Sequence, residues 1–321
     1  MTRFTWTALF ASGLRARWKT EEAISSASPR GQLVLWPGTS DPCSILARSI
    51  LVPRSDSLAG LGNPCAATGL VTLMSTIESR YDMDVHCIQE GYAGLVGDIE
   101  QQIDDVCQRV PRALVTGSTR VNYLGFSQGG LFLRSLLQRC DALPEGPLVT
   151  LGSPHAGVTS WPSCPVDASS WFCSIMDTLF IDNLGTTSLA RRTIVPASYL
   201  YDPDADAGSP FLSAVNSCRE TGDKGLYRLK YKATTFVAFS FEHDAMLEPP
   251  ASAWFGRWNG DEVVPFEQQA ELDCLRDVPF ERRVVPGASH MQLDEAFFFS
   301  EIVDRYFSSN EPMGARLFAK T

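Results

Sequence analysis

Short apolar runs along the chain alternate with stretches in which apolar residues recur at helical spacing. Runs of the first kind predict buried strands at 33–36, 83–88 and 121–124, at the start of 147–157, and within 233–244 and 282–287. The second pattern predicts helices at 68–81, 94–110, 129–140 and 293–307. In the helix expected at 94–110, one face carries Leu95, Ile99, Ile103, Val106 and Val110. Such alternation favours an α/β fold, with a mostly parallel sheet and helices on both of its faces.

The alternation is lost between about 154 and 230, where Trp, Cys, Pro and Tyr mix with short apolar clusters. We interpret this stretch as an insertion that lies over the sheet. Residues 42–64, rich in Ser, Pro and Leu, read as an inserted loop. The predicted organisation is a single domain at 31–309, preceded by a targeting or disordered segment at 1–30 and followed by a tail at 310–321.

A serine between glycines marks the most informative stretch, "NYLGFSQGG" at 122–130. Gly125, Ser127 and Gly129 form a G-x-S-x-G pattern between a predicted strand and a predicted helix. On such a turn the serine adopts a strained backbone conformation and exposes its hydroxyl above the sheet. We therefore predict that Ser127 is a catalytic nucleophile, for which the pattern alone would also allow a flexible glycine turn.

A serine nucleophile needs a base, and the base needs a carboxylate that fixes its tautomer. His290, in "PGASHMQL", follows the last predicted strand, where the base of a Ser, Asp, His chain order belongs. Of the other three histidines, His86 lies inside a predicted strand, His155 comes too early in the chain, and His243 stands where the acid is expected.

Two aspartates compete for the role of the acid. Asp244 directly follows the long apolar run that predicts the penultimate strand, and we favour it. Asp261, in "NGDEVVP", is the alternative, because many lipases carry their acid before a similar Val-Pro step. The oxyanion hole should use two backbone N–H groups, one from the residue after the nucleophile and one from the loop after the first strand. These positions predict Gln128 and Thr39 as the donors.

Charge and composition exclude several other classes. A net charge of −10 disfavours nucleic acid as a partner, because phosphate binding needs a basic surface. No apolar run approaches the roughly 20 residues that span a bilayer, so no transmembrane segment is expected. The nine cysteines form no C-x-x-C pair and there is no His-rich spacing, which argues against a zinc site. We predict neither a metal nor a cofactor.

The compartment is indicated by the cysteines and the first residues. Nine cysteines favour an oxidising compartment with disulfides over reduced core cysteines in a cytosolic protein. The opening "MTRFTWTALFASGLRARWKT" has an apolar run interrupted by threonines and followed by Arg15, Arg17 and Lys19. We interpret it as a degenerate signal peptide, although its Arg-rich, acid-free character also resembles a transit peptide.

From about residue 31 to 309, the chain resembles the palmitoyl-protein thioesterase family of α/β-hydrolases. "GFSQGGLFLRSLLQRC" (125–140) is similar to the family's nucleophile segment, "HDAMLEPPASAWFG" (243–256) to its acid segment, "SHMQL" (289–293) to its histidine segment and "SYLYDP" (198–203) to a motif in its insertion. The resemblance implies an α/β-hydrolase fold with an inserted cap region and hydrolysis of fatty-acyl thioesters. The implied partners are S-acylated proteins or peptides, and the implied location is the lysosome or secretory pathway.

The resemblance also implies disulfides and shows three departures. Cys107 with Cys140, and Cys164 with Cys173, fall where the family has disulfides, while Cys43 and Cys65 stand in for its adjacent cysteine pair. The family's His-Gly-Met-Gly type of loop after the first strand reads "PGTS" here, residues 42–61 are extra, and no N-x-S/T glycosylation sequon is present.

Three functions compete for this sequence. The first is a depalmitoylating thioesterase, and the second is a lipase or carboxylesterase that acts on oxyesters with the same triad. The third is a hydrolase-fold protein that binds without catalysis, which loss of a triad residue would favour. Because Ser127, Asp244 and His290 are all present, the sequence favours an enzyme.

Overall fold

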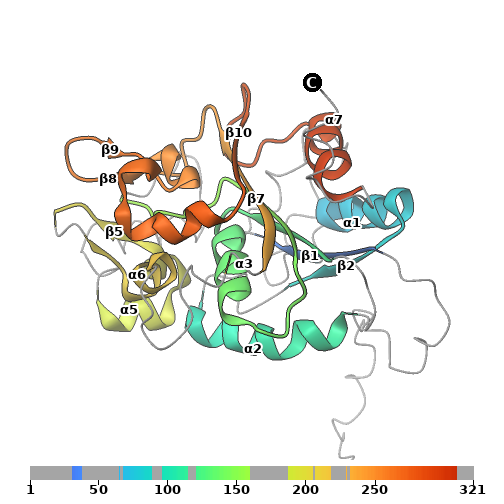
Figure 1. The fold of residues 1–321 in the computed structure, drawn as a ribbon, viewed down its shortest axis with the longest axis horizontal. Coiled ribbons are helices and arrows are strands. Elements are labelled where there is room, and N and C mark those ends of the chain that lie inside the picture. Colours follow the sequence, from blue (N-terminus) through green and yellow to red (C-terminus); the bar gives the residue numbers. More distant parts are fainter. Residues whose placement is uncertain are drawn as a thin grey trace, which may run out of the picture.

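A parallel sheet forms the centre of the molecule in the computed structural model (Figure 1). The structure describes residues 31–37, 65, 68–88, 96–114, 121–159, 187–204, 207–217, 229 and 232–308. Within these ranges the sheet contains β1 (Gly31–Trp36), β2 (Met83–Cys87), β3 (Val121–Phe126), β4 (Gly146–Leu151), β7 (Ala233–Phe241) and β10 (Phe280–Val285). Its strand order is β10-β7-β4-β3-β1-β2, and every neighbouring pair is parallel. The predicted parallel sheet is therefore confirmed.

Side chains along the central strands alternate between two hydrophobic cores, as the pleat of a strand requires. Leu35, Leu124, Val149 and Val237 are cross-strand neighbours in register and face one core. That core is covered by α1 (Thr68–Tyr81) and by α7 (Glu295–Phe297) with its π-helical continuation η10 (Phe298–Phe307). The opposite core is covered by α2 (Ile99–Ala113) and α3 (Gln128–Arg139) (Figure 1). Helices thus cover both faces, as predicted.

Helix α2 begins at Ile99 rather than at residue 94. Asp98 is the residue before the first turn, and its carboxylate accepts hydrogen bonds from the N–H groups of Glu100 and Gln101 at 2.9 and 3.4 Å. A side chain that satisfies these free N–H groups fixes the start of a helix. The predicted apolar face is buried at Ile99, Ile103, Val106 and Val110, while Leu95 lies outside the described residues.

The described part of the insertion packs on α3. It consists of α5 (Ser188–Thr193), η5 (Val195–Tyr199), β5 (Tyr201–Asp202), β6 (Ala207–Gly208) and α6 (Pro210–Asn216). Phe132 of α3 contacts Tyr199 and Phe211, with ring centroids 6.2 and 6.1 Å apart. The wholly buried Arg134, whose pKa burial lowers to about 9, donates from Nη2 to Asn216 Oδ1 at 2.7 Å. Helix α3 is therefore buried between the sheet and the insertion.

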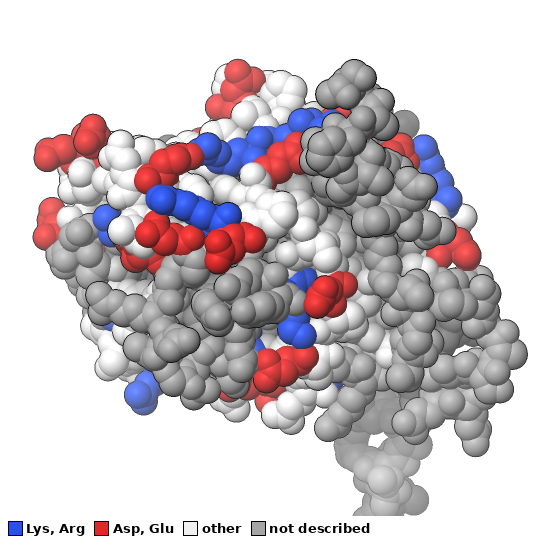
Figure 2. Space-filling model, viewed as in Figure 1, with Lys and Arg blue, Asp and Glu red and all other residues white. Residues whose placement is uncertain are grey.

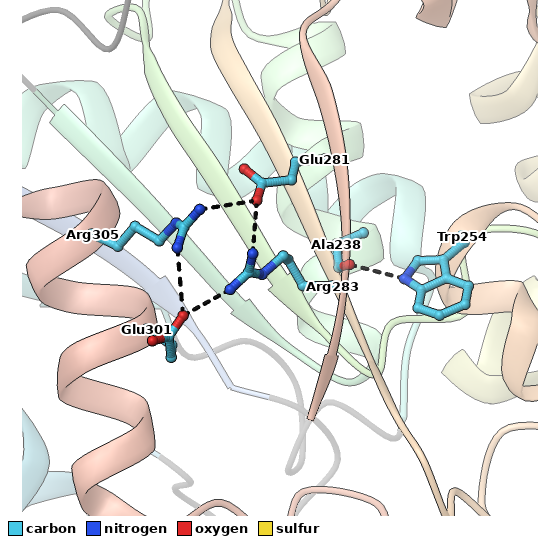
Figure 3. A network of polar contacts seen from close by, with 6 residues as sticks. All are labelled: Ala238, Trp254, Glu281, Arg283, Glu301 and Arg305. Carbon is cyan, nitrogen blue, oxygen red and sulfur yellow. Dashed lines mark hydrogen bonds and ion pairs between the residues drawn. The ribbon is translucent and has the colours of Figure 1, made fainter. Parts of the chain in front are cut away.

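Short elements fill the connection between β7 and β10, which the hydrophobic pattern did not predict. They are η7 (Pro250–Trp254), β8 (Arg257–Trp258), β9 (Val263–Val264), η8 (Phe266–Gln268) and η9 (Ala270–Asp277), with β8 and β9 forming an antiparallel pair. The indole of Trp254 donates to the carbonyl oxygen of Ala238 at 2.9 Å and fastens η7 to β7 (Figure 3). Two-residue strands are too short to show a period of two, so the sequence carries no signal for them.

A group of ion pairs joins the edge strand β10 to the last helix (Figure 3). Arg283 contacts Glu281 at 3.3 Å and Glu301 at 2.7 Å, and Arg305 contacts the same two carboxylates at 3.6 Å. On the face seen in Figure 2, described Lys and Arg side chains lie beside Asp and Glu side chains. Because these side chains are partly exposed, each pair contributes little to stability.

Two disulfides lie within the described residues. The bond between Cys107 and Cys140 joins the helix before β3 to the end of the helix after it, and that predicted pair is confirmed. Cys65 is bonded to Cys87 at the end of β2, so the implied pairing of Cys65 with Cys43 is wrong. Cys43, Cys164 and Cys173 lie outside the described residues, as do residues 1–30, 42–61 and 310–321.

Candidate active site

Ser127 occupies the turn between β3 and α3. Its backbone has φ 50° and ψ −130°, a conformation that side-chain-bearing residues rarely adopt. The turn is held because Ser127 N donates to Leu151 O at 2.8 Å and Gly130 N donates to Ser127 O at 3.0 Å. The predicted strained turn is present, and backbone strain retained at such a position is typical of a functional site.

The glycines around Ser127 are required by close backbone contacts. A β-carbon on Gly125 would lie 2.3 Å from the Cα of Gly130, and one on Gly129 would lie 2.3 Å from the carbonyl oxygen of Trp36. One on Gly130 would lie 2.0 Å from the hydroxyl of Ser153. Any larger residue at these positions would force β1, β3 and α3 apart, so the turn could not place Ser127 at the sheet edge.

His290 lies in the loop after β10, and its ring contacts both other residues of the predicted triad. Its Nε2 is 3.1 Å from the Ser127 hydroxyl oxygen, and its Nδ1 is 2.8 Å from Asp244 Oδ2. These distances suit a base that takes a proton from the serine while its other nitrogen donates to the carboxylate. Residues 163 positions apart in the sequence are thus brought into one hydrogen-bonded chain.

Asp244 follows β7, and its side chain is completely buried. Oδ2 faces His290, whereas Oδ1 accepts hydrogen bonds from the N–H groups of Met246 and Leu247 at 2.9 and 3.0 Å. The backbone therefore fixes one carboxylate oxygen and leaves the other for the histidine. The alternative acid, Asp261, is exposed in the turn between β8 and β9.

The remaining histidines lie outside this chain of contacts. His86 is in β2, as predicted, and His243 is exposed beyond the end of β7. His155 is fully buried against Phe255, and its Nε2 is 3.0 Å from the Thr150 hydroxyl. Burial and the charge of Arg134 hold the pKa of His155 well below its usual value, so this ring is neutral.

One of the two predicted oxyanion donors can be placed. Gln128 is the first residue of α3 and directly follows Ser127, whereas Thr39 lies outside the described residues. The side chain of Gln128 is buried, and its Oε1 accepts a hydrogen bond from the Tyr199 hydroxyl at 3.1 Å. Burial raises the pKa of Tyr199, so its hydroxyl remains protonated and can donate.

Sequence reasoning missed two neighbours of the site, Tyr199 and Gly152. Tyr199 is in η5 of the insertion, 71 positions from Gln128; it belongs to the motif "SYLYDP", but no role at the site was predicted for it. Gly152 directly follows β4 and has φ +57°, and it lies against the ring of His290. A glycine directly after a strand would have indicated a positive φ at this position, but sequence spacing could not indicate what lies against it.

The fold and the site together define a class of protein. A parallel sheet carries a serine on a sharp strand-to-helix turn, with a histidine and an aspartate on loops after later strands. This architecture is that of the α/β-hydrolases. A model of the family described as palmitoyl protein thioesterase matches residues 58–273. The chain belongs to that family, and the resemblance stated from its motifs is confirmed.

Two relatives illustrate the extent of the similarity. The palmitoyl-protein thioesterase-dolichyl pyrophosphate phosphatase fusion 1 of Schizosaccharomyces pombe is 28% identical over 274 residues, which are 78% of this chain and 43% of that protein. Palmitoyl-protein thioesterase 1 of Caenorhabditis elegans is 28% identical over 203 residues, 58% of this chain and 66% of the relative. The matched part thus spans less than half of the first relative and about two thirds of the second.

Similarity to solved structures is lower. Aspergillus fumigatus lipase B aligns with a TM-score of 0.42 at 12% identity, over 80% of this chain and 44% of the lipase. The esterase domain of a Rhodothermus marinus protein aligns with a TM-score of 0.41 at 14% identity, over 88% and 90% of the two chains. These values support no statement about activity.

The structure also bears on membranes and metals. None of the described helices is long and apolar enough to cross a membrane. In the ranges that the structure describes, no three His, Cys, Asp or Glu residues come together as they would around a metal ion.

Proposed function

We propose that this protein hydrolyses long-chain fatty-acyl thioesters, such as palmitoyl groups on the cysteines of lipid-modified proteins. The observation that carries the proposal is the hydrogen-bonded chain from Ser127 through His290 to Asp244 in a member of the palmitoyl protein thioesterase family. Both relatives carry palmitoyl-protein thioesterase in their names. No cofactor and no metal take part in the proposed reaction.

In the first half of the proposed reaction, Ser127 Oγ attacks the thioester carbonyl carbon while His290 Nε2 takes the hydroxyl proton. Asp244 stabilises the imidazolium that forms and keeps its Nδ1–H directed at the carboxylate. The backbone N–H groups of Gln128 and Thr39 are the proposed donors to the developing oxyanion. When the tetrahedral intermediate collapses, the C–S bond breaks and the imidazolium gives its proton to the departing thiolate.

In the second half, water attacks the acyl-serine while His290 Nε2 takes one of its protons. Collapse of the second tetrahedral intermediate breaks the ester bond and returns that proton to Ser127 Oγ, which releases the fatty acid. Splitting hydrolysis into two steps through an acyl-enzyme is the advantage of a covalent mechanism. A palmitoyl chain needs an apolar groove, which we place under the insertion at 154–230.

We further propose that the protein acts in the lysosome or the secretory pathway. The disulfides Cys65–Cys87 and Cys107–Cys140 support an oxidising compartment, because such bonds are rare in the cytosol. We also propose one domain at 31–309 that carries the insertion.

A lipase or carboxylesterase is the second candidate function, because the same three residues can cleave an oxyester. Thiolates are better leaving groups than alkoxides, so a nucleophile and base that cleave oxyesters also cleave thioesters. The two functions therefore differ in acyl-chain and leaving-group preference rather than in the triad. A protein that only binds acyl groups would have no need of the 3.1 and 2.8 Å contacts of His290.

The deciding experiment compares kcat/KM for a palmitoyl thioester with kcat/KM for a short-chain oxyester of matched leaving group. Hydrolysis of the palmitoyl thioester that exceeds oxyester hydrolysis by at least about tenfold is the expected result, since tenfold corresponds to about 1.4 kcal/mol of differential transition-state binding. A preference for the oxyester would establish the lipase or carboxylesterase instead. Failure of both substrates, with folded protein, would favour the binding function.

A further inference from the structure

Gly152 lies directly beneath the proposed catalytic base. It follows the last residue of β4, and its N–H donates to the carbonyl oxygen of Phe239 in β7 at 2.8 Å. This bond continues the pairing of β4 and β7, so the backbone at Gly152 is fixed relative to the strand that leads to Asp244. Its φ of +57° lies in the left-handed region, which glycine adopts without cost.

The space above Gly152 is taken by two rings. A β-carbon at this position would lie 2.9 Å from Cε1 and 3.1 Å from Nδ1 of His290, and 2.8 Å from Cε2 of Phe241. The ring centroids of Phe241 and His290 are 5.7 Å apart. Distances below about 3 Å to carbon cannot persist, because carbon atoms make their best contact at about 3.5 to 4.0 Å. A side chain at residue 152 would therefore have to displace at least one of the two rings.

We propose that Gly152 is a positioning residue that seats the His290 ring between Ser127 and Asp244. This inference rests on the proposed function of His290 as the base. Because Gly152 has no side chain, the His290 imidazole can lie close against the backbone. In this position Nε2 contacts Ser127 and Nδ1 contacts Asp244. The ring of Phe241 lies beside the His290 ring, and its buried position in β7 leaves it little room to move.

Displacing the ring should affect chemistry rather than substrate binding. A misplacement of about 1 Å can cost on the order of 10²-fold in rate, because proton transfer depends on the distance and angle at Nε2. Gly152 has no side chain that could contact a bound acyl chain. We therefore expect Gly152→Ala to lower kcat about 100-fold and to leave KM within about threefold of wild type.

Two variants separate the contact with His290 from backbone strain. Alanine at φ +57° adds both strain and a β-carbon, whereas asparagine tolerates the left-handed region and still adds the β-carbon. Gly152→Ala and Gly152→Asn should therefore both be slow. Gly260→Ala is the control, because Gly260 has φ +103° and an added β-carbon there meets nothing within 4 Å. We expect it to retain kcat within about twofold.

The measurement is the rate of Ser127 labelling by a fluorophosphonate, together with the downfield proton NMR signal of the His290–Asp244 hydrogen bond. Labelling amplitude counts folded sites, and the rate constant reports on their geometry. The phosphonate needs the triad and no particular ester, so a preference for oxyesters would overturn the proposed function without altering this test. Slow labelling in both Gly152 variants, with a shifted or broadened NMR signal, is the expected result.

Three outcomes would overturn the role of Gly152. Labelling rates within threefold of wild type in both variants would mean that the ring does not need this space. A slow Ala variant with a wild-type rate for Gly152→Asn would assign the effect to backbone conformation alone. Complete loss of labelling amplitude in both, with a normal Gly260→Ala, would assign Gly152 to folding.

Discussion

Asp244 shows how a single residue meets two demands in this site. One carboxylate oxygen is held by the backbone N–H groups of Met246 and Leu247, and the other is 2.8 Å from His290 Nδ1. A carboxylate that already accepts two backbone hydrogen bonds cannot rotate freely, so its second oxygen has a fixed direction. That direction selects the histidine tautomer in which Nε2 can accept the serine proton.

Asp244→Asn should lower kcat by several orders of magnitude. Asparagine keeps the shape but favours the wrong tautomer of His290, a change that cost about 10⁴ in kcat in a serine protease. Steady-state kinetics with a palmitoyl thioester would measure the loss. Asp261→Asn is the matched control and should change kcat by less than about tenfold, because Asp261 is exposed between β8 and β9.

Both aspartate variants should keep a melting temperature near that of wild type, so that unfolding is not mistaken for a catalytic effect. A large loss for Asp261→Asn with a small loss for Asp244→Asn would reassign the acid. It would also favour the lipase hypothesis, because Asp261 was considered on account of the Val-Pro step that follows it, a feature of many lipases.

How much of the site can be predicted residue by residue depends on the kind of signal. Ser127, Asp244 and His290 come after the ends of β3, β7 and β10, and strand ends are visible in the hydrophobic pattern. Gly152 and Phe241 pack against His290, which is more than 40 positions away from each of them in the sequence. Contacts of this kind produce no periodic hydrophobic pattern. The triad residues could therefore be predicted from the sequence. The packing of Gly152 and Phe241 against His290 could not, because it depends on the tertiary structure.

Among the elements, a hydrogen bond links the described part of the insertion to the nucleophile turn. Tyr199 of η5 donates to Gln128 Oε1, and Gln128 is the residue whose backbone N–H is the proposed oxyanion donor. The rings of Tyr199 and Phe211 both pack around Phe132 of α3. The insertion thus contacts α3 both at Gln128, the first residue of the helix, and at Phe132, in the first half of the helix.

Tyr199→Phe should therefore lower kcat by about three- to tenfold, because Gln128 would lose a buried hydrogen bond worth about 1 kcal/mol. The matched control is Tyr123→Phe. Tyr123 is also buried, and its hydroxyl donates to the carbonyl oxygen of Pro144 at 2.7 Å, away from Ser127. Both variants should lose similar free energy of unfolding in urea, and only Tyr199→Phe should lose kcat. Equal kcat values in the two variants would contradict the link.

Elements with a strong period were predicted and the others were not. The helix at 68–81 and the strands of the sheet were found because they bury continuous or periodic apolar faces. The predicted start of α2, residue 94, was wrong. Asp98 has an extended backbone, and its carboxylate accepts the N–H groups of the first turn, so the helix begins at Ile99. Elements such as β8, β9 and η5 depend on tertiary contacts, including the bond from Trp254 to Ala238.

At the scale of the whole molecule, the Cys107–Cys140 bond ties together the two helices on the α3 side of the sheet. Its sequence separation is 33 residues, for which the chain-entropy model gives about 3 to 4 kcal/mol of stabilisation. Replacing both cysteines by serine should lower the free energy of unfolding by about that amount in urea titrations. Mass mapping of the native protein that finds both thiols free would contradict the bond and the oxidising compartment.

The molecule as a whole is acid-rich. Its net charge is −10, and on the face shown in Figure 2 described Lys and Arg side chains lie beside Asp and Glu side chains. The fold class was predictable from the alternation of strands and helices, whereas the order of the strands was not predicted. The packing of the insertion on α3 was not predictable, because its segment carries no regular hydrophobic pattern.

The central claim is that Ser127 forms the acyl-enzyme, and site mapping with a fluorophosphonate tests it most directly. The protein is incubated with the probe, with and without a palmitoyl thioester as competitor, and the labelled peptide is identified by mass spectrometry. We predict a single label on Ser127 that the thioester slows, and no label on Ser127→Ala. A label that persists in Ser127→Ala, or that maps to another residue, would place the nucleophile elsewhere and contradict the mechanism.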